Sequence, residues 1–477
     1  MIVFDLINDE APLFIEGLKV LFSKRTLSYD NVIGVTEGSR WKEESKAIKN
    51  VNRLAFFDEL EKKNVDLKKE LLRIAKTYEN NNIYGCDRYL IQKDKEYQKK
   101  MLVYTYLFYE DLFQKNISHY FTTGIAYTYN LVSYQVSKRF NVKHISFYGT
   151  RVENNTAICF DNKNSFGEVD ALFDEFHLNK VTKDMYTFIE GFVKAPKQPY
   201  YMKNAINALS IKPVFIKEFF IRFNKYFLEN RHKYDMFTRS PFELTGIKLK
   251  KMILSKIINF RHDSIFEKVD YSERYFIYPI HMQPEASTLV QSPFHIDQKA
   301  AIINISRLLP LNTILYVKEH RSALGKQSLE FYRELKQHPN IKLISYRENM
   351  FELINNCVGT INLTSTVGLE SLFFKKPSIV LGDVFYNNTG LTFRVNSFHE
   401  LGKVVETVNQ DGFKVDEYFE QYDAKLAYYI YCLNKKAYPF EFNVAKLDTK
   451  ERVLRKENVE GFAYCINAII EKNYNNL

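Results

Sequence analysis

Three polar clusters follow apolar runs within residues 271–390. The first places His281, Gln283 and Glu285 within five positions of one another, and Pro284 stiffens the turn that presents the glutamate. An imidazole and a carboxylate at such spacing can bind sugar hydroxyls or move a proton. The alternative interpretation is an acid that caps the amino terminus of a helix. The residues alone leave both interpretations open.

The second cluster is Lys318-Glu319-His320-Arg321, directly after the apolar run Leu-Tyr-Val. Its three basic side chains suit a phosphate leaving group, because positive donors stabilise the negative charge that grows on the departing oxygen. A histidine there can also give up a proton near neutral pH. The competing interpretation is a charged surface turn, which the spacing alone slightly favours.

The third cluster is the run of residues 364–370, in which Ser365 and Thr366 precede Gly368 and Glu370. The hydroxyl residues predict a cap for a helix that begins near Gly368, and free amides at such a helix start attract phosphate. Glu370 would lie in the first turn, where its two oxygens suit a ribose diol. Its alternative role is an acid that only complements the helix dipole.

Since neither GxGxxG nor GxxxxGK[ST] occurs in the chain, dehydrogenase and P-loop functions lose support.

All three clusters stand where a predicted strand ends, and the elements around them alternate between strand and helix. The predicted strands of this region are Tyr275–Ile280, Thr313–Val317, Ile341–Ile344, Gly359–Leu363 and Ser378–Leu381. Ligands of alternating α/β units bind at the carboxyl edge of the parallel sheet. The three clusters are therefore expected to share one edge and to form a pocket for a phosphorylated, sugar-bearing ligand.

The first 190 residues show the same alternation. Met1–Leu6 and His144–Phe147 are predicted strands, and Tyr127–Phe140 is a predicted helix. The charged run Val51–Thr77 has helical periodicity and is predicted to form one helix. Strands and helices joined by short links indicate parallel sheets. The predicted fold class is α/β, with two Rossmann-like, doubly wound domains, a helical insertion between them and C-terminal helices.

With 477 residues the chain is too long for one ordinary core, so two domains plus connections are expected. The predicted ranges are 1–190 for an N-terminal Rossmann-like domain, 191–268 for a basic, aromatic helical linker, 269–400 for a C-terminal Rossmann-like domain, and 401–477 for C-terminal helices that pack back across the domains.

The net charge of +10 comes from one segment, because residues 191–268 hold 16 Lys and Arg against 6 Asp and Glu. The rest of the chain is balanced, which argues against nucleic acid as a partner. Within the segment, Ile216–Leu228 carries phenylalanines at helical spacing, interleaved with basic residues. This pattern is typical of a helix on an anionic membrane surface or of a helix that packs on its own domain, and packing is the favoured interpretation.

Other features restrict the setting. No run approaches the ~20 apolar residues of a membrane span, and the amino terminus resembles a strand and not a signal peptide. The five cysteines lack any metal-ligand spacing, so we expect free thiols and a cytoplasmic location. If the basic segment binds lipid, the protein is expected to be peripheral at the inner face of the cell membrane. Neither a cofactor nor a metal ion is predicted.

Three charged residues of the first domain follow predicted strands. Asp9 and Glu10 follow the first strand, and Arg151 follows a later one, so these three are the candidates for holding the acceptor. The sequence does not select a catalytic base among Asp5, Asp9, Glu10 and Glu16.

A family resemblance rests on the order of these motifs. The stretches are Tyr278-Pro-Ile-His-Met-Gln-Pro-Glu-Ala-Ser-Thr288, Val317-Lys-Glu-His320, Ser365-Thr-Val-Gly-Leu-Glu-Ser-Leu372, Lys376-Pro377 and Gly382-Asp-Val-Phe-Tyr386. Together they resemble the bacterial capsule polysaccharide biosynthesis family, which includes transferases of 3-deoxy-manno-octulosonic acid (Kdo) from its CMP-activated form. The resemblance is strongest over about residues 271–390.

The resemblance implies a GT-B glycosyltransferase fold in which the second domain holds the nucleotide. It places His320 at the donor phosphate, Ser365, Thr366 and Glu370 at the phosphate and ribose, and Glu285 at the sugar. The sequence departs from the family pattern at Arg321, where related transferases carry proline, and this departure bears on the identity of the donor. The lack of a DxD pair agrees with a metal-independent reaction.

The leading hypothesis is a metal-independent glycosyltransferase of surface polysaccharide synthesis. Glu285 and His320 would be catalytic, and the residues expected to bind the nucleotide sugar are His281, Gln283, Lys318, Arg321, Ser365, Thr366, Gly368 and Glu370. The expected partners are a nucleotide sugar, a glycan or glycolipid acceptor, and an anionic membrane surface that binds 191–268. Two alternatives stay open, a nucleotide-sugar 2-epimerase of the same build and a non-catalytic scaffold of a capsule assembly complex.

Overall fold

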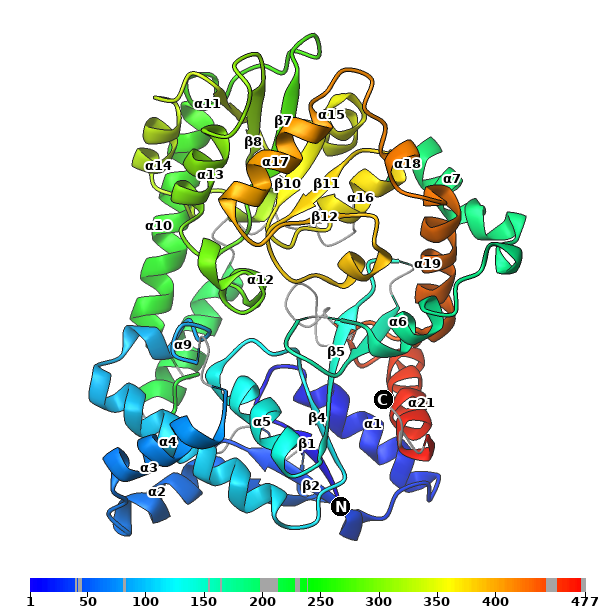
Figure 1. Ribbon diagram of the computed structural model, residues 1–477. Helices are drawn as coiled ribbons and strands as arrows, with labels where there is room; N and C mark the ends of the chain where they lie inside the picture. The colour runs from blue at the N-terminus through cyan, green and yellow to red at the C-terminus, as the bar shows by residue number, and fades with distance from the viewer. Residues whose placement is uncertain are drawn as a thin grey trace. The chain divides into compact units, whose positions relative to one another are not determined.

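Two compact units make up the chain in the computed structural model (Figure 1). Unit 1 holds Met1–Ala171, Arg231–Phe237 and Cys432–Leu477, and unit 2 holds Leu172–Asn230 and Thr238–Tyr431. The structure describes residues 1–38, 41, 45–79, 83–152, 155–163, 165–197, 213–227, 232–237, 239–442 and 453–472. Both units are discontinuous in the chain, whereas the ranges expected from the sequence were contiguous.

Unit 1 is built on a six-stranded sheet in the order β3-β2-β1-β4-β5-β6. Its strands are β1 (Ile2–Asp5), β2 (Val32–Thr36), β3 (Lys49–Asn52), β4 (His119–Thr122), β5 (Lys143–Gly149) and β6 (Thr156–Cys159). All neighbours are parallel except β6, which runs antiparallel to β5. The order reverses between β1 and β4, as in a Rossmann fold.

Helices cover both faces of this sheet, because alternate strand residues point to opposite sides. Phe121 of β4 belongs to an apolar core with helices α1 and α21, whereas the neighbouring Tyr120 hydrogen-bonds Tyr109 of α4 at 3.0 Å. The helices of unit 1 are α1 (Ala11–Ser23), α2 (Arg53–Lys62), α3 (Leu67–Thr77), α4 (Lys95–Phe113), α5 (Thr128–Arg139), the start of α6 (Gly167–Phe173) and α21 (Lys456–Glu471). The unit is doubly wound, as predicted.

Unit 2 repeats the same topology with strands that are all parallel, in the order β12-β11-β10-β7-β8-β9. Its strands are β7 (Tyr275–Pro279), β8 (Ile314–Lys318), β9 (Ile341–Ile344), β10 (Gly359–Asn362), β11 (Ser378–Val380) and β12 (Phe393–Arg394). Numbered along the unit, both sheets have the strand order 3-2-1-4-5-6. The order of unit 2 reverses between β7 and β10.

One face of the second sheet packs Tyr275, Ile277 and Tyr316 against α15, with Phe192 of α7 beside them. The helices of unit 2 are α7 (Thr187–Lys194), α9 (Pro213–Phe227), α10 (Pro241–Phe260), α11 (His262–Ile265), α12 (Ala286–Leu289), α13 (Gln298–Ser306), α14 (Leu329–Leu335), α15 (Met350–Asn356), α16 (Val367–Phe373), α17 (Phe398–Val408), α18 (Val415–Tyr418) and most of α19 (Tyr422–Lys436). Helix α13 contacts β8. The described helices include none with the length and apolar content to cross a membrane.

The predicted fold class is confirmed, because both units are α/β with Rossmann-like parallel sheets. One predicted element is wrong. The run Val51–Thr77 is the end of β3 followed by two helices, because Asn64 adopts a left-handed backbone and Asp66 caps the second helix through the amides of Lys68 and Lys69. Helical periodicity continued through this turn, so the periodicity alone did not reveal it. The predicted helix Ile216–Leu228 corresponds to α9, and Leu228 lies outside the described residues.

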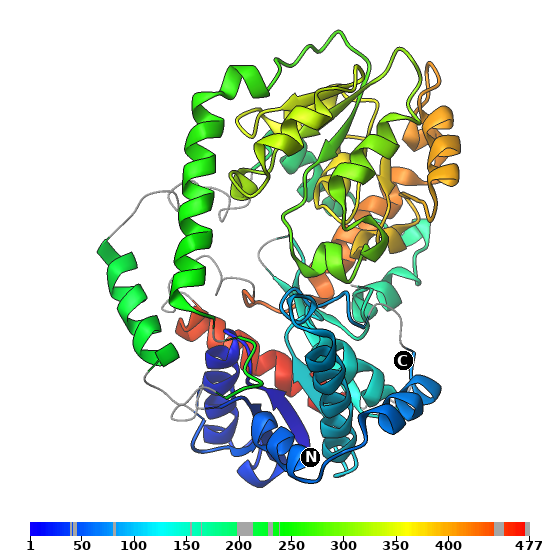
Figure 2. The ribbon, with the colours of Figure 1, turned by 90° about the vertical axis from the view of Figure 1, so that its left-hand side faces the viewer.

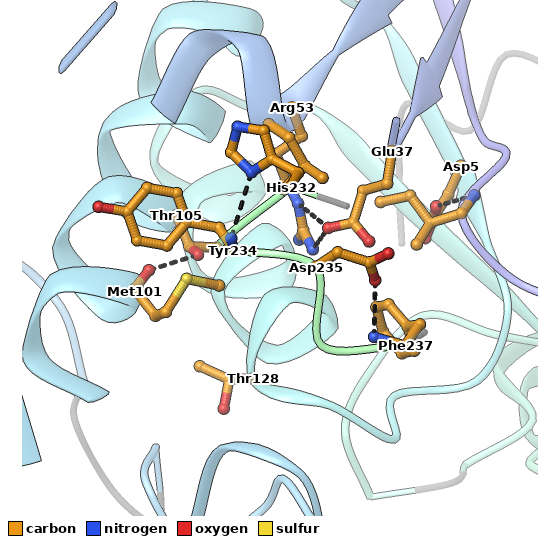
Figure 3. A network of polar contacts seen from close by, with 12 residues as sticks. Asp5, Glu37, Arg53, Met101, Thr105, Thr128, His232, Tyr234, Asp235 and Phe237 are labelled. Atoms are coloured by element: carbon orange, nitrogen blue, oxygen red, sulfur yellow. Dashed lines mark hydrogen bonds and ion pairs between the residues drawn. The ribbon is translucent and has the colours of Figure 1, made fainter. Parts of the chain in front are cut away.

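A buried ionic network lies at the carboxyl edge of the unit 1 sheet (Figure 3). The Arg53 side chain is fully buried, and its Nε donates to Glu37 Oε1 at 2.9 Å. Asp5, at the end of β1, is also fully buried and accepts a hydrogen bond from Thr122 Oγ1 at 2.7 Å. Burial raises the pKa of both acids, and the positive charge of Arg53 opposes that rise. One guanidinium therefore compensates two carboxyl groups inside the unit.

The segment 232–237 belongs to unit 1 although helices of unit 2 flank it in the chain. His232 Nε2 lies 2.7 Å from Asp58 Oδ2, and the buried ring of Tyr234 packs on Phe57 and Tyr104. Figure 3 shows this segment passing beside the Arg53 network. These contacts tie the middle of the basic segment to unit 1.

We expect the change Arg53→Met to lower the free energy of unfolding by ~3–5 kcal/mol, because it leaves buried carboxyl groups without their cation. The double change Glu37→Leu and Arg53→Met should recover part of that loss, since it removes both members of the pair. The control is Lys99→Met, which breaks the exposed Lys99–Glu96 pair and should change the free energy of unfolding far less, because solvent screens that pair. Urea denaturation of the four proteins measures the effect, and equal losses for the two single variants would contradict it.

Candidate functional site

The candidate site is the carboxyl edge of the unit 2 sheet at its switch point. The three polar clusters follow β7, β8 and β10, and these strands are neighbours in the order β10-β7-β8. Ligands of doubly wound sheets bind at such an edge, where the strand order reverses. The predicted strands therefore deliver the clusters to one edge of one sheet.

His281 connects the two strands at the switch point. The side chain of Gln298 holds its backbone from both sides, accepting from the His281 amide at 2.7 Å and donating to its carbonyl at 2.9 Å. The ring Nε2 accepts a hydrogen bond from the amide of Thr364 at 3.2 Å. Thr364 Oγ1 donates in turn to the carbonyl of Ser287 at 3.0 Å. The loops after β7 and β10 are thus joined by side-chain to backbone bonds.

The electrostatic state of His281 follows from this geometry. Burial and the neighbouring His320 lower the pKa of His281 to about 3, so the imidazole is neutral at physiological pH. Because Nε2 accepts a hydrogen bond, Nδ1 carries the proton. A neutral His281 orients the loop after β10 and does not itself act as an acid.

The end of β8 presents His320 as a hydrogen-bond donor. Its Nδ1 accepts from the amide of Ser322 at 3.1 Å, which leaves the proton on Nε2. Burial and the charge of Lys318 are the main causes that lower the pKa of His320 to about 4. His320 is therefore a neutral Nε2–H donor, whereas the sequence suggested a proton donor near neutral pH. A bound anion would raise this pKa.

Glu319 supports that loop and does not face a ligand. It is buried and accepts hydrogen bonds from the His320 amide at 2.8 Å and from the hydroxyl of Tyr332. The acid between Lys318 and His320 therefore holds the strand end in place.

Positive charge accumulates around His320. Lys318 is buried, and its side chain makes no hydrogen bond or ion pair with any residue that the structure describes. Burial lowers its pKa to about 8, opposed by the charges of Glu348 and Glu319.

Two further lysines act on His320, Lys251 of α10 and Lys326. Their amines donate to backbone carbonyls, that of Ser322 at 2.9 Å and that of Gln283 at 3.2 Å. Lys318 and Lys251 form no ion pair with any residue that the structure describes, so positive charge collects at this edge.

The third cluster is arranged around Asn362, the last residue of β10. Asn362 Oδ1 accepts from the amide of Ser365 at 2.9 Å, and the hydroxyl of Tyr386 donates to the Ser365 carbonyl at 2.5 Å. Ser365 Oγ accepts from the amide of Val367 at 3.2 Å, whereas Thr366 makes no side-chain cap. The predicted cap therefore belongs to Ser365, and α16 starts one residue earlier than expected.

Gly368 has a packing role in this arrangement, and its predicted contact with a nucleotide sugar stays a prediction. A Cβ built on it would lie 2.2 Å from the hydroxyl of Tyr386 and 2.8 Å from Asn362 Nδ2. Only glycine lets α16 approach β10 this closely.

The two predicted acids of unit 2 lie at the same sheet edge. Glu285 occupies the position before α12, but its side chain makes no cap hydrogen bond, so the capping interpretation is wrong. Glu370 lies in the first turn of α16, and its charge adds to the rise of the pKa of Tyr386, which burial dominates. Their roles toward a sugar and a ribose stay predictions.

The remaining predicted residues serve the loops or lie in unit 1. Gln283 Nε2 donates to the carbonyl of Ile296 at 2.7 Å, and Arg321 lies near enough to Lys318 to help lower its pKa. In unit 1, Asp9 and Glu10 lie between β1 and α1, and the exposed Arg151 follows β5 with a left-handed backbone. Their acceptor role stays a prediction.

Sequence reasoning missed Lys251, Lys326 and Gln298 as parts of this site. Lys251 lies in the basic segment, where its charge was assigned to a surface, and no local pattern distinguishes it from its neighbours. Gln298 opens a helix 17 residues after the histidine that it holds. Only the tertiary structure brings these side chains to the strand ends.

A two-domain α/β protein with an anion site at one switch point is the class that these observations define. Residues 225–403 match the family described as capsule polysaccharide biosynthesis protein. The matched residues contain the site, and the predicted resemblance to this family is confirmed over this range. The protein FixF of Sinorhizobium fredii is 27% identical over 143 residues, which span 28% of this chain and 33% of the relative.

Solved structures with similar arrangements include a β-Kdo 2,7 transferase, KpsC of Thermosulfurimonas dismutans, with 15% identity over 69% of this chain and 88% of that chain and a TM-score of 0.29. UDP-GlcNAc 2-epimerase of Methanocaldococcus jannaschii has 10% identity over 89% of this chain and 96% of that chain, with a TM-score of 0.27. Anabaena HepE in complex with UDP-glucose has 9% identity over 98% and 99%, also with a TM-score of 0.27. At such values the fold assignment depends on the sheet topology.

We expect His281 to make stability depend on pH. The folded protein keeps His281 neutral down to about pH 3, whereas an unfolded histidine binds a proton near pH 6.5. The unfolded state then holds more protons between these values, so the free energy of unfolding falls as the pH falls, by up to ~1.4 kcal/mol per pH unit from this group.

The change His281→Gln keeps an acceptor for the Thr364 amide and removes the titration, so its stability should fall less steeply below pH 6.5 than that of the wild type. Urea denaturation between pH 5 and pH 8 measures the slopes. His177→Gln, at an exposed position of the same unit, is the control. Parallel slopes for wild type and His281→Gln would contradict the assignment.

Proposed function

We propose that this protein is a glycosyltransferase that moves a sugar from a nucleotide-activated donor to a glycan or glycolipid acceptor in capsule or surface polysaccharide synthesis. The observation that supports it best is the positive charge of Lys318, Lys251 and Lys326, which act together on His320 at the switch point of unit 2. A departing nucleotide phosphate supplies the negative charge that this site lacks. Membership of residues 225–403 in the capsule polysaccharide biosynthesis family supports the same role.

In the proposed reaction an acceptor hydroxyl oxygen attacks the anomeric carbon of the donor sugar. The bond between that carbon and the phosphate oxygen breaks, and the nucleotide leaves with both electrons. Lys318 and the Nε2–H of His320 stabilise the growing charge on the leaving oxygen, because such groups act most strongly in a site away from water. Glu285 takes the proton of the acceptor hydroxyl, and Glu370 binds the ribose. The proposal includes no metal ion and no cofactor.

The donor in this proposal is a CMP-sugar such as CMP-Kdo, and the resemblance to Kdo transferases of the capsule family motivates that choice. The acceptor is placed in unit 1, where Asp9, Glu10 and Arg151 follow strands at the carboxyl edge of the sheet. A glycolipid acceptor would bring the protein to a membrane surface, for which residues 191–268 supply the positive charge.

Replacing His320 tests the leaving-group role. His320→Asn keeps an oxygen where Nδ1 accepts the Ser322 amide and removes the Nε2–H, so the fold should survive while turnover falls by roughly 10²–10³. His399→Ala, at an exposed position of α17, is the control and should turn over normally. Rates of transfer and melting temperatures of the three proteins decide the question. Normal transfer by His320→Asn would rule out this role.

Lys318 gives a second test, in which stability and binding change in opposite directions. Lys318→Met removes an unpaired buried charge, so the free protein should melt at a higher temperature. The same change should abolish the rise in melting temperature that a nucleotide causes. At a hundredfold excess over its dissociation constant a ligand adds about 2.7 kcal/mol to the wild type.

The nucleotides to compare are CMP, CDP, UDP and GDP, and CMP is the expected responder. Incubation with the responding nucleotide sugar alone separates a transferase from a 2-epimerase, because only an epimerase forms an epimer without an acceptor. A protein that binds none of the four nucleotides would fit the scaffold alternative and contradict the proposal.

A further inference from the structure

Helix α10 has two faces with opposite environments. Ser255 and Ile258 are buried against unit 2, and Lys251 lies on the same side with its amine on the Ser322 carbonyl. A Cβ at Gly325 would lie 2.3 Å from the carbonyl oxygen of Lys251, so the loop after β8 packs directly on the helix backbone. These contacts fix which face of α10 turns toward the sheet.

The opposite face of α10 is an exposed apolar stripe. It consists of Phe242, Leu249, Ile253 and Phe260, whose exposed fractions are 59%, 46%, 47% and 91%. Their spacings of seven, four and seven residues bring them to one line along an α-helix. Lys251 lies about half a turn from this line at 100° per residue. The helix cannot bury the stripe by rotating, since rotation would pull Lys251 and Ser255 away from the site loop.

Helix α9 extends the same surface. Its Phe219, Phe223 and Phe227 rings lie 5.5, 6.2 and 6.2 Å from the ring of Phe242. Its Phe220 is 59% exposed. Figure 2 shows α10 as the long green helix and α9 as the shorter green helix beside its lower end. The two helices therefore form a hairpin with aromatic side chains on its outside.

Basic residues flank the stripe. Lys248, Lys250 and Lys256 of α10 are exposed. The acid of this helix, Glu243, pairs with Arg239. An apolar line between lysines is typical of a helix that lies in a membrane interface, and the charges along α10 oppose its insertion across a bilayer.

We propose that the α9–α10 hairpin docks on an anionic bilayer surface, with the stripe of Phe242, Leu249, Ile253 and Phe260 in the headgroup region and the lysines on anionic lipid. The proposal rests on the proposed function for its purpose, since a glycolipid acceptor resides in such a surface. It assigns the docking to α10, whereas the sequence pointed to the α9 phenylalanines. The same helix then carries lipid contacts on one face and Lys251 of the anion site on the other.

Vesicle co-sedimentation of the full chain tests this surface. The probes are vesicles of phosphatidylcholine alone and vesicles that also contain phosphatidylglycerol. Wild type should bind the anionic vesicles at least about tenfold more tightly, because each basic residue near the surface contributes about fivefold. The variant Leu249→Gln, Ile253→Gln, Phe260→Ser should lose at least about tenfold in binding to the anionic vesicles. The variant Lys248→Gln, Lys250→Gln, Lys256→Gln should lose the preference for anionic lipid.

The matched control changes Phe294→Ser and Leu311→Gln, which are 94% and 106% exposed elsewhere in unit 2. It should bind vesicles like the wild type. Binding of wild type and stripe variant to the same degree would overturn the proposal. A second result would also overturn it: wild type binds neither kind of vesicle but forms dimers in light scattering, and the stripe variant does not form them. The stripe would then join two copies of the chain.

The nucleotide-induced rise in melting temperature separates this proposal from the proposed function. All of these variants should keep it, because none alters a residue of the anion site. Vesicle binding without any nucleotide response would leave the docking surface in place and remove only the enzymatic role.

Discussion

The buried amine of Lys318 is the constraint on which the chemistry of this protein depends. A charge held away from water without a partner costs folding free energy, and its pKa near 8 reflects that cost. The charges of Glu348 and Glu319 offset that cost only in part. Glu319 is the nearest acid in sequence, but it is engaged with Tyr332 and the His320 amide. A site that keeps such a charge and adds Lys251 and Lys326 nearby is organised for an anion that arrives from outside.

The two units share one topology but treat their switch points differently. In unit 1 the end of β1 is closed, because Asp5, Thr122 and Asn130 bond to one another below the surface. The loops after the corresponding strands of unit 2 are joined by the bond of the Thr364 amide to His281 and by that of the Thr364 hydroxyl to the Ser287 carbonyl. Beside them, the side chain of Lys318 makes no hydrogen bond with a described residue, and Lys251 donates to a backbone carbonyl. The same strand order therefore gives a structural junction in unit 1 and an anion-binding edge in unit 2, so a fold-level argument alone would not have separated them.

The sequence was sufficient where the signal is local. An apolar run followed by polar residues predicts a strand end, and this rule found the positions of His281, His320 and Ser365. It failed where geometry depends on a single backbone conformation, as at Asn64, where a left-handed residue divides one expected helix into two. It also failed for Lys251, because nothing in the local sequence distinguishes this lysine, which contacts Ser322, from the other basic residues of the segment 191–268. Tertiary contacts between distant segments leave no periodicity to detect.

Helix α10 shows why the basic segment resisted a sequence interpretation. Its apolar residues occur all round the helix, and such a pattern normally indicates burial on every side. Only one side is buried, however. The loop after β8 packs on the helix through the contact of Gly325 with Ser255, whereas the opposite side of the helix is exposed. The apolar residues on the other side then need a different environment, and the exposed lysines beside them favour one that is negatively charged. If that environment is a bilayer, one rigid helix contacts lipid with one face and places Lys251 at the anion site with the other. A single element then links a lipid-bound acceptor to a nucleotide donor.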